Sequence, residues 1–193
     1  MSIVFDKFIL QYIILASLAL DEVFNNAYNC NMEGNEALEK VLDSYRGYYN
    51  VTTEGIEPPF CAEAEFHSHN EQYLLVKAAR IADIDDNEYV FFALENHLTS
   101  EKLVELCDAA WKRGLSRVNP VEGHRCSDVI LFLLADSVDE DVFNAAKKIK
   151  HYKSYLLSFR GWSHFRLLVR DCSSGRLACN RMGSDLKKAA AKL

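Results

Sequence analysis

The sequence lacks the short motifs that identify many enzyme classes. It contains no Gly-x-Gly-x-x-Gly, no Walker A pattern, no Gly-x-Ser-x-Gly and no His-Glu-x-x-His. No sequence motif therefore indicates a nucleotide-binding protein, an α/β-hydrolase or a zincin metalloprotease. Since no catalytic set is identifiable, we expect no cofactor and favour a protein that is not an enzyme.

Disulfide and membrane signals are also missing. The six cysteines form no Cys-x-x-Cys pair, and several lie inside apolar runs, which indicates reduced thiols in a cytoplasmic protein. The apolar run over residues 8–20 is shorter than the ~20 residues that a spanning helix needs. It also lacks a clear signal-peptide cleavage site. We expect a buried or partner-facing helix here, and no membrane partner.

Acidic residues are scarce in the last quarter of the chain. Residues 142–193 hold 12 Lys and Arg against 2 Asp and Glu, a net charge of +10, whereas residues 1–141 hold 10 against 26, a net charge of −16. Such segregation indicates either an anion or nucleic-acid surface or a fold that neutralises its own charge. The sequence leaves both alternatives open.

Length and composition indicate one globular domain with an appendage, at 193 residues with 49% hydrophobic and 26% charged residues. We place an apolar helix and a polar break in residues 1–33, a single domain in residues 34–183, and a frayed or disordered basic tail in residues 184–193. The first part of the domain predicts a three-stranded antiparallel meander joined by short polar segments. Its strands are expected over residues 61–69, 72–82 and 88–95, with turns over residues 69–71 and 83–87.

Helix signals flank a buried strand in the middle of the domain. A helix is expected to begin at Thr99 or Ser100 and to run to Arg113, because Gly114 follows as an end signal. Residues 128–135 are apolar on both faces, as in a central strand covered by helices. The sequence from Ser137 to Glu140 reads as a capping box that opens a second helix.

The second helix is expected to run to about residue 151, and strands over residues 155–169 and a short last strand then form a C-terminal β-hairpin. The fold class is therefore mixed α/β, of the α+β type. We expect one mixed sheet with helices packed on it, together with the N-terminal helices.

The basic hairpin is the candidate ligand-binding surface. Period-two alternation places cationic and aromatic side chains on one face of the strand and Phe165, Leu167 and Val169 on the other. Guanidinium groups bind oxyanions, and aromatic rings stack on bases. The alternative is that these arginines pair with the chain's own carboxylates across strands. The candidate ligand-binding residues are Arg160, Trp162, His164, Arg166 and Arg170.

The neighbouring lysines have a simpler explanation. Lys147, Lys148, Lys150 and Lys153 fall at the end of a helix whose start is acidic, so we interpret them as complementing the helix dipole.

A second candidate site is a metal centre on the first strand. Alternation places Glu63, Glu65, His67 and His69 on one face, with ligand types that zinc or another divalent metal accepts. Of these, Glu65, His67 and His69 are the candidate ligands. The function that this site implies is a metal-dependent nuclease or hydrolase. A His-x-His pair without an identifiable third ligand also occurs on solvated strand faces.

Five segments carry a resemblance to a known family: Phe66-His67-Ser68-His69-Asn70-Glu71-Gln72-Tyr73, Lys153-Ser154-Tyr155, Phe159-Arg160-Gly161-Trp162, Arg166-Leu167-Leu168-Val169 and Asn180-Arg181-Met182-Gly183. Through these segments, residues 42–188 resemble an uncharacterised domain of clostridia and other Gram-positive bacteria, which implies a bacterial protein and supplies no activity. The order of elements is also similar to that of restriction-endonuclease-like cores, whose chemistry needs an Asp and a Glu-x-Lys. The strand over residues 88–95 contains no lysine, so we transfer no catalytic residue.

The sequence therefore favours a binding or assembly module whose partner is an anionic ligand or an acidic protein, with nucleic acid less favoured. A structural homodimer formed through the apolar helix over residues 5–28 is a further alternative.

Overall fold

The computed structural model describes residues 34–73 and 80–190, apart from the side chains of residues 68–86, 188 and 189. The predicted N-terminal helix over residues 5–28 lies outside this part of the chain. Seven strands form one sheet in the order β1-β2-β3-β4-β6-β5, with β7 paired to β6. The strands are β1 (Asn50–Thr52), β2 (Ala62–Tyr73), β3 (Arg80–Leu98), β4 (His124–Val138), β5 (Tyr152–Ser154), β6 (Trp162–Asp171) and β7 (Leu177–Cys179).

Helices cover both faces of this sheet. Residues 34–46 are helical, and the later helices are α2 (Ser100–Arg117), α3 (Val142–Lys148), the 3-10 turn η1 (Arg181–Gly183) and α4 (Leu186–Ala190). The β3–β4 and β4–β6 pairs are parallel, and the other pairs are antiparallel. This arrangement confirms the predicted mixed α/β class with a single mixed sheet.

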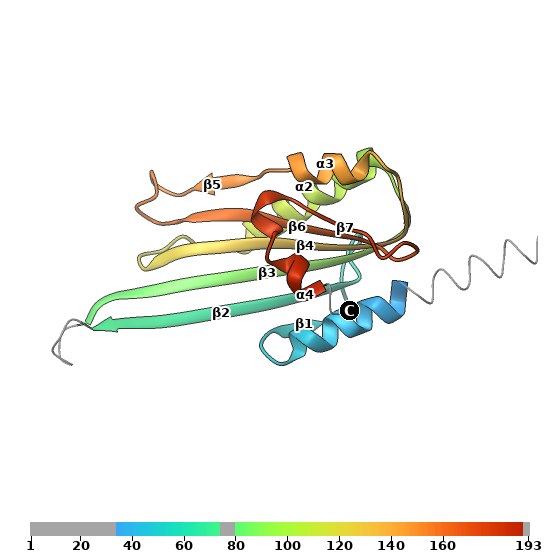
Figure 1. The fold of residues 1–193 in the computed structure, drawn as a ribbon. Helices are drawn as coiled ribbons and strands as arrows, with labels where there is room; N and C mark the ends of the chain where they lie inside the picture. Colours follow the sequence, from blue (N-terminus) through green and yellow to red (C-terminus); the bar gives the residue numbers. More distant parts are fainter. Residues whose placement is uncertain (1–33, 74–79, 191–193) are drawn as a thin grey trace, which may run out of the picture.

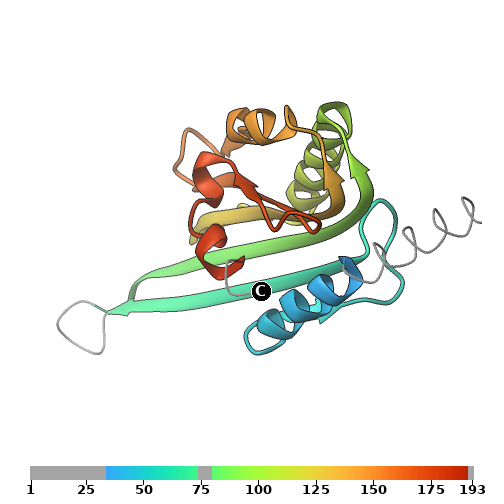
Figure 2. The same cartoon turned by 45° about the vertical axis from the view of Figure 1, so that its right-hand side comes forward.

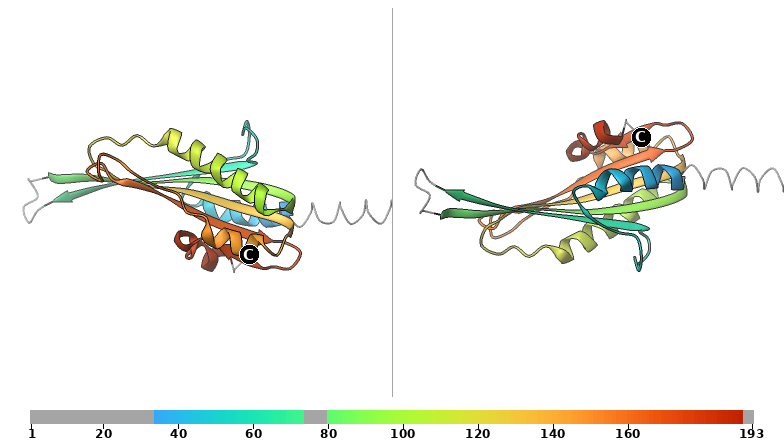
Figure 3. Two further views of the ribbon diagram at one scale, coloured as in Figure 1. Left: turned by 90° about the horizontal axis from the view of Figure 1, so that it is seen from above. Right: turned by 90° about the horizontal axis from the view of Figure 1, so that it is seen from below.

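Two hydrophobic cores lie on opposite sides of the sheet (Figure 1). Leu131 and Leu133 of β4 face α2 and α3, whereas Ile130 and Phe132 face the helix over residues 34–46 and α4. Figure 3 shows α2 and the helix over residues 34–46 on opposite sides of the sheet. Because both faces are covered, β4 is apolar along both of its faces, as the sequence predicts.

The predicted meander is wrong in its strand boundaries. The acidic segment over residues 83–87 is part of β3 rather than a turn, and it pairs with Glu71 through His67 of β2. This segment contains no glycine or proline, and the ladder supplies its backbone hydrogen bonds, so polarity alone does not break the strand. The three antiparallel strands are β1, β2 and β3, and the β2–β3 arm extends past the body of the domain (Figure 2).

Both predicted helix boundaries near β4 need correction. Helix α2 runs past Gly114 to Arg117, and the glycine is required by packing, since a Cβ there would lie 2.5 Å from Cγ2 of Val129. The predicted capping box at Ser137 is absent, because β4 stays paired with β3 as far as Val138. Helix α3 begins instead after Asp141, whose side chain makes no cap hydrogen bond.

The C-terminal hairpin is present, but its strands differ from the prediction. Strand β5 precedes the expected start and pairs with residues 162–164 of β6, while residues 155–161 form a loop with positive φ at Leu156, Leu157, Ser158 and Gly161. In the basic tail, residues 186–190 form α4, and Leu186 and Ala190 belong to the hydrophobic core on one side of the sheet.

Candidate functional site

Arg166, predicted to be an exposed ligand-binding residue, is instead the centre of a buried charge network. Its side chain on β6 lies 3.1 Å from Oδ2 of Asp128 and 3.4 Å from Oε1 of Glu88, and it also pairs with Asp185. The residue is only 9% exposed. The hydroxyl of Tyr49 donates a further hydrogen bond to Glu88. The chain's own carboxylates therefore neutralise Arg166, which was the alternative left open by the sequence.

Burial and charge act together on the groups in this network. Burial alone would lower the pKa of Arg166, but Asp185, Asp128 and Glu88 outweigh it and raise that pKa. Burial, with a further contribution from Glu88, raises the pKa of Tyr45 to about 12. The network therefore keeps Arg166 charged and Tyr45 neutral at physiological pH.

The network makes Arg166 important for stability. We expect Arg166→Met to lower the free energy of unfolding by about 2 kcal/mol, because the substitution leaves partly buried carboxylates unpaired. Urea unfolding measures this change. Arg46→Met is the control: Arg46 pairs with Asp43 and Glu39 on the surface, so a loss of no more than about 0.5 kcal/mol is expected. Equal losses in both variants would contradict the interpretation.

The other predicted ligand-binding residues do not form one open surface. Arg170 donates to the backbone oxygen of Ala190 in α4 at 3.2 Å, so the tail covers it. Arg160 lies in the loop before β6 and donates to Pro120 O at 3.3 Å. Trp162 and His164 are half-buried neighbours whose ring centroids are 6.4 Å apart.

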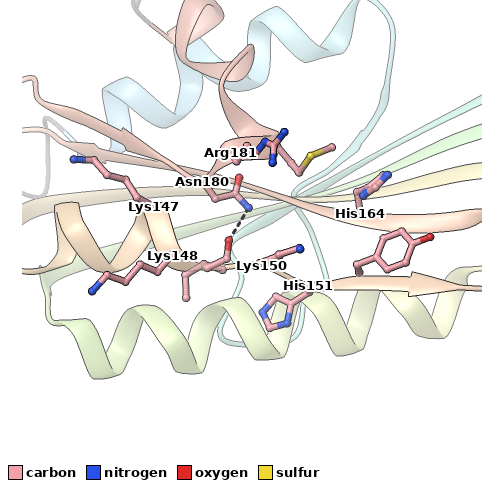
Figure 4. Close-up of a pocket in the computed structure, with 10 residues that line it drawn as sticks. Lys147, Lys148, Lys150, His151, His164, Asn180 and Arg181 are labelled. Atoms are coloured by element: carbon pink, nitrogen blue, oxygen red, sulfur yellow. Dashed lines mark hydrogen bonds between the residues drawn. The ribbon is translucent and has the colours of Figure 1, made fainter.

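A pocket of about 650 Å³ lies at the β6 edge of the sheet, between α3, β5 and η1 (Figure 4). Lys150 and Arg181 approach it from two sides, while Lys147 and Lys148 extend from α3 at one end. The pocket also contains both imidazoles of His151 and His164 and the ring of Tyr152. His164 is the one predicted ligand-binding residue that lines it.

Asn180 fixes the shape of this pocket. Its side chain is 2% exposed and makes four hydrogen bonds, which satisfy both the acceptor and the donor capacity of the amide. Its Oδ1 accepts from Leu167 N at 3.0 Å and from Gly183 N at 2.8 Å. Its Nδ2 donates to Ile149 O at 3.3 Å and to Phe165 O at 2.9 Å. One side chain thus joins β6, η1 and the segment that follows α3.

The pocket is strongly cationic. No carboxylate is found among the described residues that line it, and its four Lys and Arg side chains form no ion pair within the same part of the chain. Burial lowers the pKa of His151 in spite of the nearby Asp108, and the imidazole stacks on Trp111 with 5.5 Å between ring centroids. Burial thus favours the neutral form of His151, and the lysines and the arginine bring positive charge to the pocket.

Sequence reasoning missed this pocket because it assigned the lysines to a helix end. That account holds for Lys147 and Lys148, which occupy the last turn of α3. Lys150 lies beyond the helix, and Arg181 comes from η1. The signal in the sequence was the excess of basic over acidic residues after residue 141, too large for one helix end to explain.

Two of the predicted metal ligands lie close together, since Nε2 of His67 is 3.5 Å from Oε2 of Glu65, but each also has another partner. Glu63 pairs with Arg113 at 2.6 Å and with Arg117, and Arg117 also pairs with Glu65 at 2.6 Å. Nδ1 of His67 lies 2.8 Å from Oδ1 of Asn87, and the side chain of His69 lies outside the described residues. Within the described part of the chain, no group of three or more metal-ligating side chains is arranged to hold an ion. The metal site stays a prediction.

A family model described as a domain of unknown function, DUF8052, matches residues 33–192, in agreement with the resemblance to an uncharacterised domain. No curated protein and no solved structure matches the chain. Among the described residues, no helix is long and apolar enough to cross a membrane.

Proposed function

The chain belongs to the DUF8052 family, a domain of unknown function, and we propose from its geometry that it is a binding module for a small anionic ligand. The ligand occupies the pocket between α3, β5, β6 and η1. The observation that carries this proposal is that Lys147, Lys148, Lys150 and Arg181 line a pocket to which the described part of the chain contributes no carboxylate. In contrast, Arg113, Arg117 and Arg166 are all paired within the fold.

The lining residues favour phosphate or carboxylate groups attached to a flat body. Lys150 and Arg181 supply an ammonium and a guanidinium on two sides of the pocket, and both groups form charge-assisted hydrogen bonds to oxyanions. The ring centroids of Tyr152 and His164 lie 5.3 Å apart, and these two rings of the pocket lining offer a surface for stacking. Asn180 uses all its hydrogen-bonding capacity within the fold, so it shapes the pocket and is not expected to contact the ligand.

The proposal includes a cytoplasmic location, supported by the reduced thiols of Cys61, Cys107 and Cys179. We expect the same pocket in the related domains of clostridia and other Gram-positive bacteria. The likeness to restriction-endonuclease-like cores contributes no catalytic step, since arginines hold both Glu63 and Glu65.

Binding assays with simple anions test this function. The probes are pyrophosphate, ATP, citrate, a glutamate-rich peptide and a short single-stranded DNA, each titrated at low and at physiological salt. We expect one or more of the small anions to bind, with affinity that falls as salt rises. Lys150→Ala combined with Arg181→Ala should weaken this binding by about tenfold or more, since two charge-assisted contacts are lost.

The matched control is Lys112→Ala, which removes an exposed lysine of α2 outside the pocket. This variant should bind as the wild type does. Absence of binding to every probe, or equal affinity of all three proteins, would refute the proposal. Tighter binding of the peptide or the DNA than of the small anions would indicate that the partner is a macromolecule and not a small ligand.

A further inference from the structure

The loop over residues 155–161 presents large apolar side chains to solvent. Leu156 is 67% exposed, Leu157 is 88% exposed and Phe159 is 85% exposed. The loop connects β5 to β6 at the end of the sheet away from α3 (Figure 1). Three large apolar side chains clustered in one short loop form an exposed patch of the kind that marks an interaction surface.

The loop is held in place by its own contacts. Tyr155 N donates to Gly161 O at 2.9 Å, and Gly161 N donates to Ser158 O at 3.2 Å. The Tyr155 hydroxyl lies 2.9 Å from Oγ of Ser163, and its ring packs edge-on against His124. These contacts hold the apolar side chains outward in the unbound protein, so the loop needs little further ordering when it binds a partner.

The backbone of the loop supports a functional role. Leu156, Leu157 and Ser158 have φ values of 48°, 52° and 71°, a left-handed conformation that non-glycine residues adopt at a cost. Such conformations persist where surrounding structure enforces them, and they concentrate at functional sites. Here the conformation turns both leucine side chains away from the core into solvent.

Cationic residues flank the apolar tip. Lys153 precedes it, Arg160 follows Phe159, and Arg125 lies beside Gly161 on the next strand. All three residues are exposed and form no ion pair with a described residue. Glu122, also exposed, is the acidic side chain in the adjoining segment. The surface therefore combines an exposed apolar tip with flanking residues of net positive charge.

We propose that this loop is a peripheral docking tip for an anionic lipid membrane, a role separate from ligand binding in the pocket. Leu156, Leu157 and Phe159 enter the boundary between headgroups and acyl chains, while Lys153, Arg160 and Arg125 contact the anionic headgroups. Apolar insertion combined with electrostatic attraction is how peripheral proteins bind such surfaces. The expectation of no membrane partner rested on residues 8–20 and did not concern this loop.

Vesicle sedimentation tests the proposal. The protein is mixed with vesicles of phosphatidylcholine alone, or of phosphatidylcholine with phosphatidylglycerol, at low and at physiological salt. We expect binding to the anionic vesicles, weaker binding at the higher salt, and little binding to the neutral ones. Leu157→Ser combined with Phe159→Ser should weaken binding to anionic vesicles by about tenfold or more.

Tyr48→Ser is the matched control, because Tyr48 is 82% exposed but lies outside the loop. It should bind vesicles as the wild type does. Circular dichroism of the loop variant checks that the fold is retained, as expected for exposed positions. No vesicle binding, or binding unchanged by the loop substitutions, would overturn the proposal. A dimer detected by light scattering and dissociated by the same substitutions, without vesicle binding, would assign the loop to a second copy of the chain instead.

Discussion

Asn180→Asp is expected to lower the free energy of unfolding by about 4 kcal/mol, the largest change among the substitutions considered. The substitution replaces the amide nitrogen, which donates to Ile149 O and Phe165 O, by an oxygen that repels both. The new carboxyl group is also buried where the wild-type side chain is 2% exposed. A thermal melt should show a fall in Tm of about 10 °C.

The pH dependence distinguishes this electrostatic effect from a loss of packing. Burial raises the pKa of the introduced carboxyl group in the folded state, so folding favours its protonated form. The loss in the free energy of unfolding relative to the wild type should therefore be smallest near pH 4 and should grow as the pH rises towards 7. Asn144→Asp, at an exposed position of α3, is the control and should be close to wild type. A destabilisation of about 1 kcal/mol lowers Tm by about 2 °C or more in a protein of this size. A Tm for Asn180→Asp within 2 °C of the wild-type value would therefore contradict the role given to Asn180.

Gly161→Ala is expected to destabilise the protein by about 3 kcal/mol for two additive reasons. The glycine has a φ of 73°, which alanine adopts at a cost of about 1 kcal/mol. A Cβ at this position would also lie 2.1 Å from the backbone oxygen of Arg125 and 2.8 Å from that of His124. Backbone atoms in a strand move little, so the loop must shift or the strand pairing must distort.

Gly175→Ala separates these two contributions. Gly175 has a similar φ of 68°, but a Cβ at this position would have no atom within 4 Å. Gly175→Ala should therefore lower the free energy of unfolding only by the cost of a positive φ for alanine, about 1 kcal/mol. Chemical denaturation of both variants measures the difference, which should not depend on pH because no titratable group is involved. Equal losses at the two positions would show that the close approach of Arg125 is unimportant.

Local patterns predicted much of the fold. The apolar run of β4 indicated a strand covered on both faces, and Thr99 indicated the start of α2, where its side chain accepts from Lys102 N. Local sequence patterns predicted the wrong secondary structure where contacts with distant segments of the chain determine it. Gly114 resembles a helix end in sequence, but Val129 of β4 requires a glycine inside the helix. Residues 83–87 resemble a turn until β2 pairs with them.

The candidate site shows the same limit. Alternation placed Arg166 correctly on the face opposite Phe165 and Leu167, but it could not show that β3, β4 and the tail all bring carboxylates to it. The pocket brings Lys150 and Arg181 together across about 30 residues of chain. Neither residue belongs to a recognised anion-binding motif, so only the overall excess of basic residues indicated a cationic site.

The parallel pairing of β4 also affects the order in which the protein can fold. Leu131 pairs with Phe91 on one side and with Leu167 on the other, and each pairing closes a loop of about 40 residues. The antiparallel β2–β3 pair is more local and can form first, whereas the centre of the sheet must wait for α2 and α3. Until then both apolar faces of β4 are exposed to solvent, so this strand is the segment of the chain most prone to aggregate during synthesis and refolding.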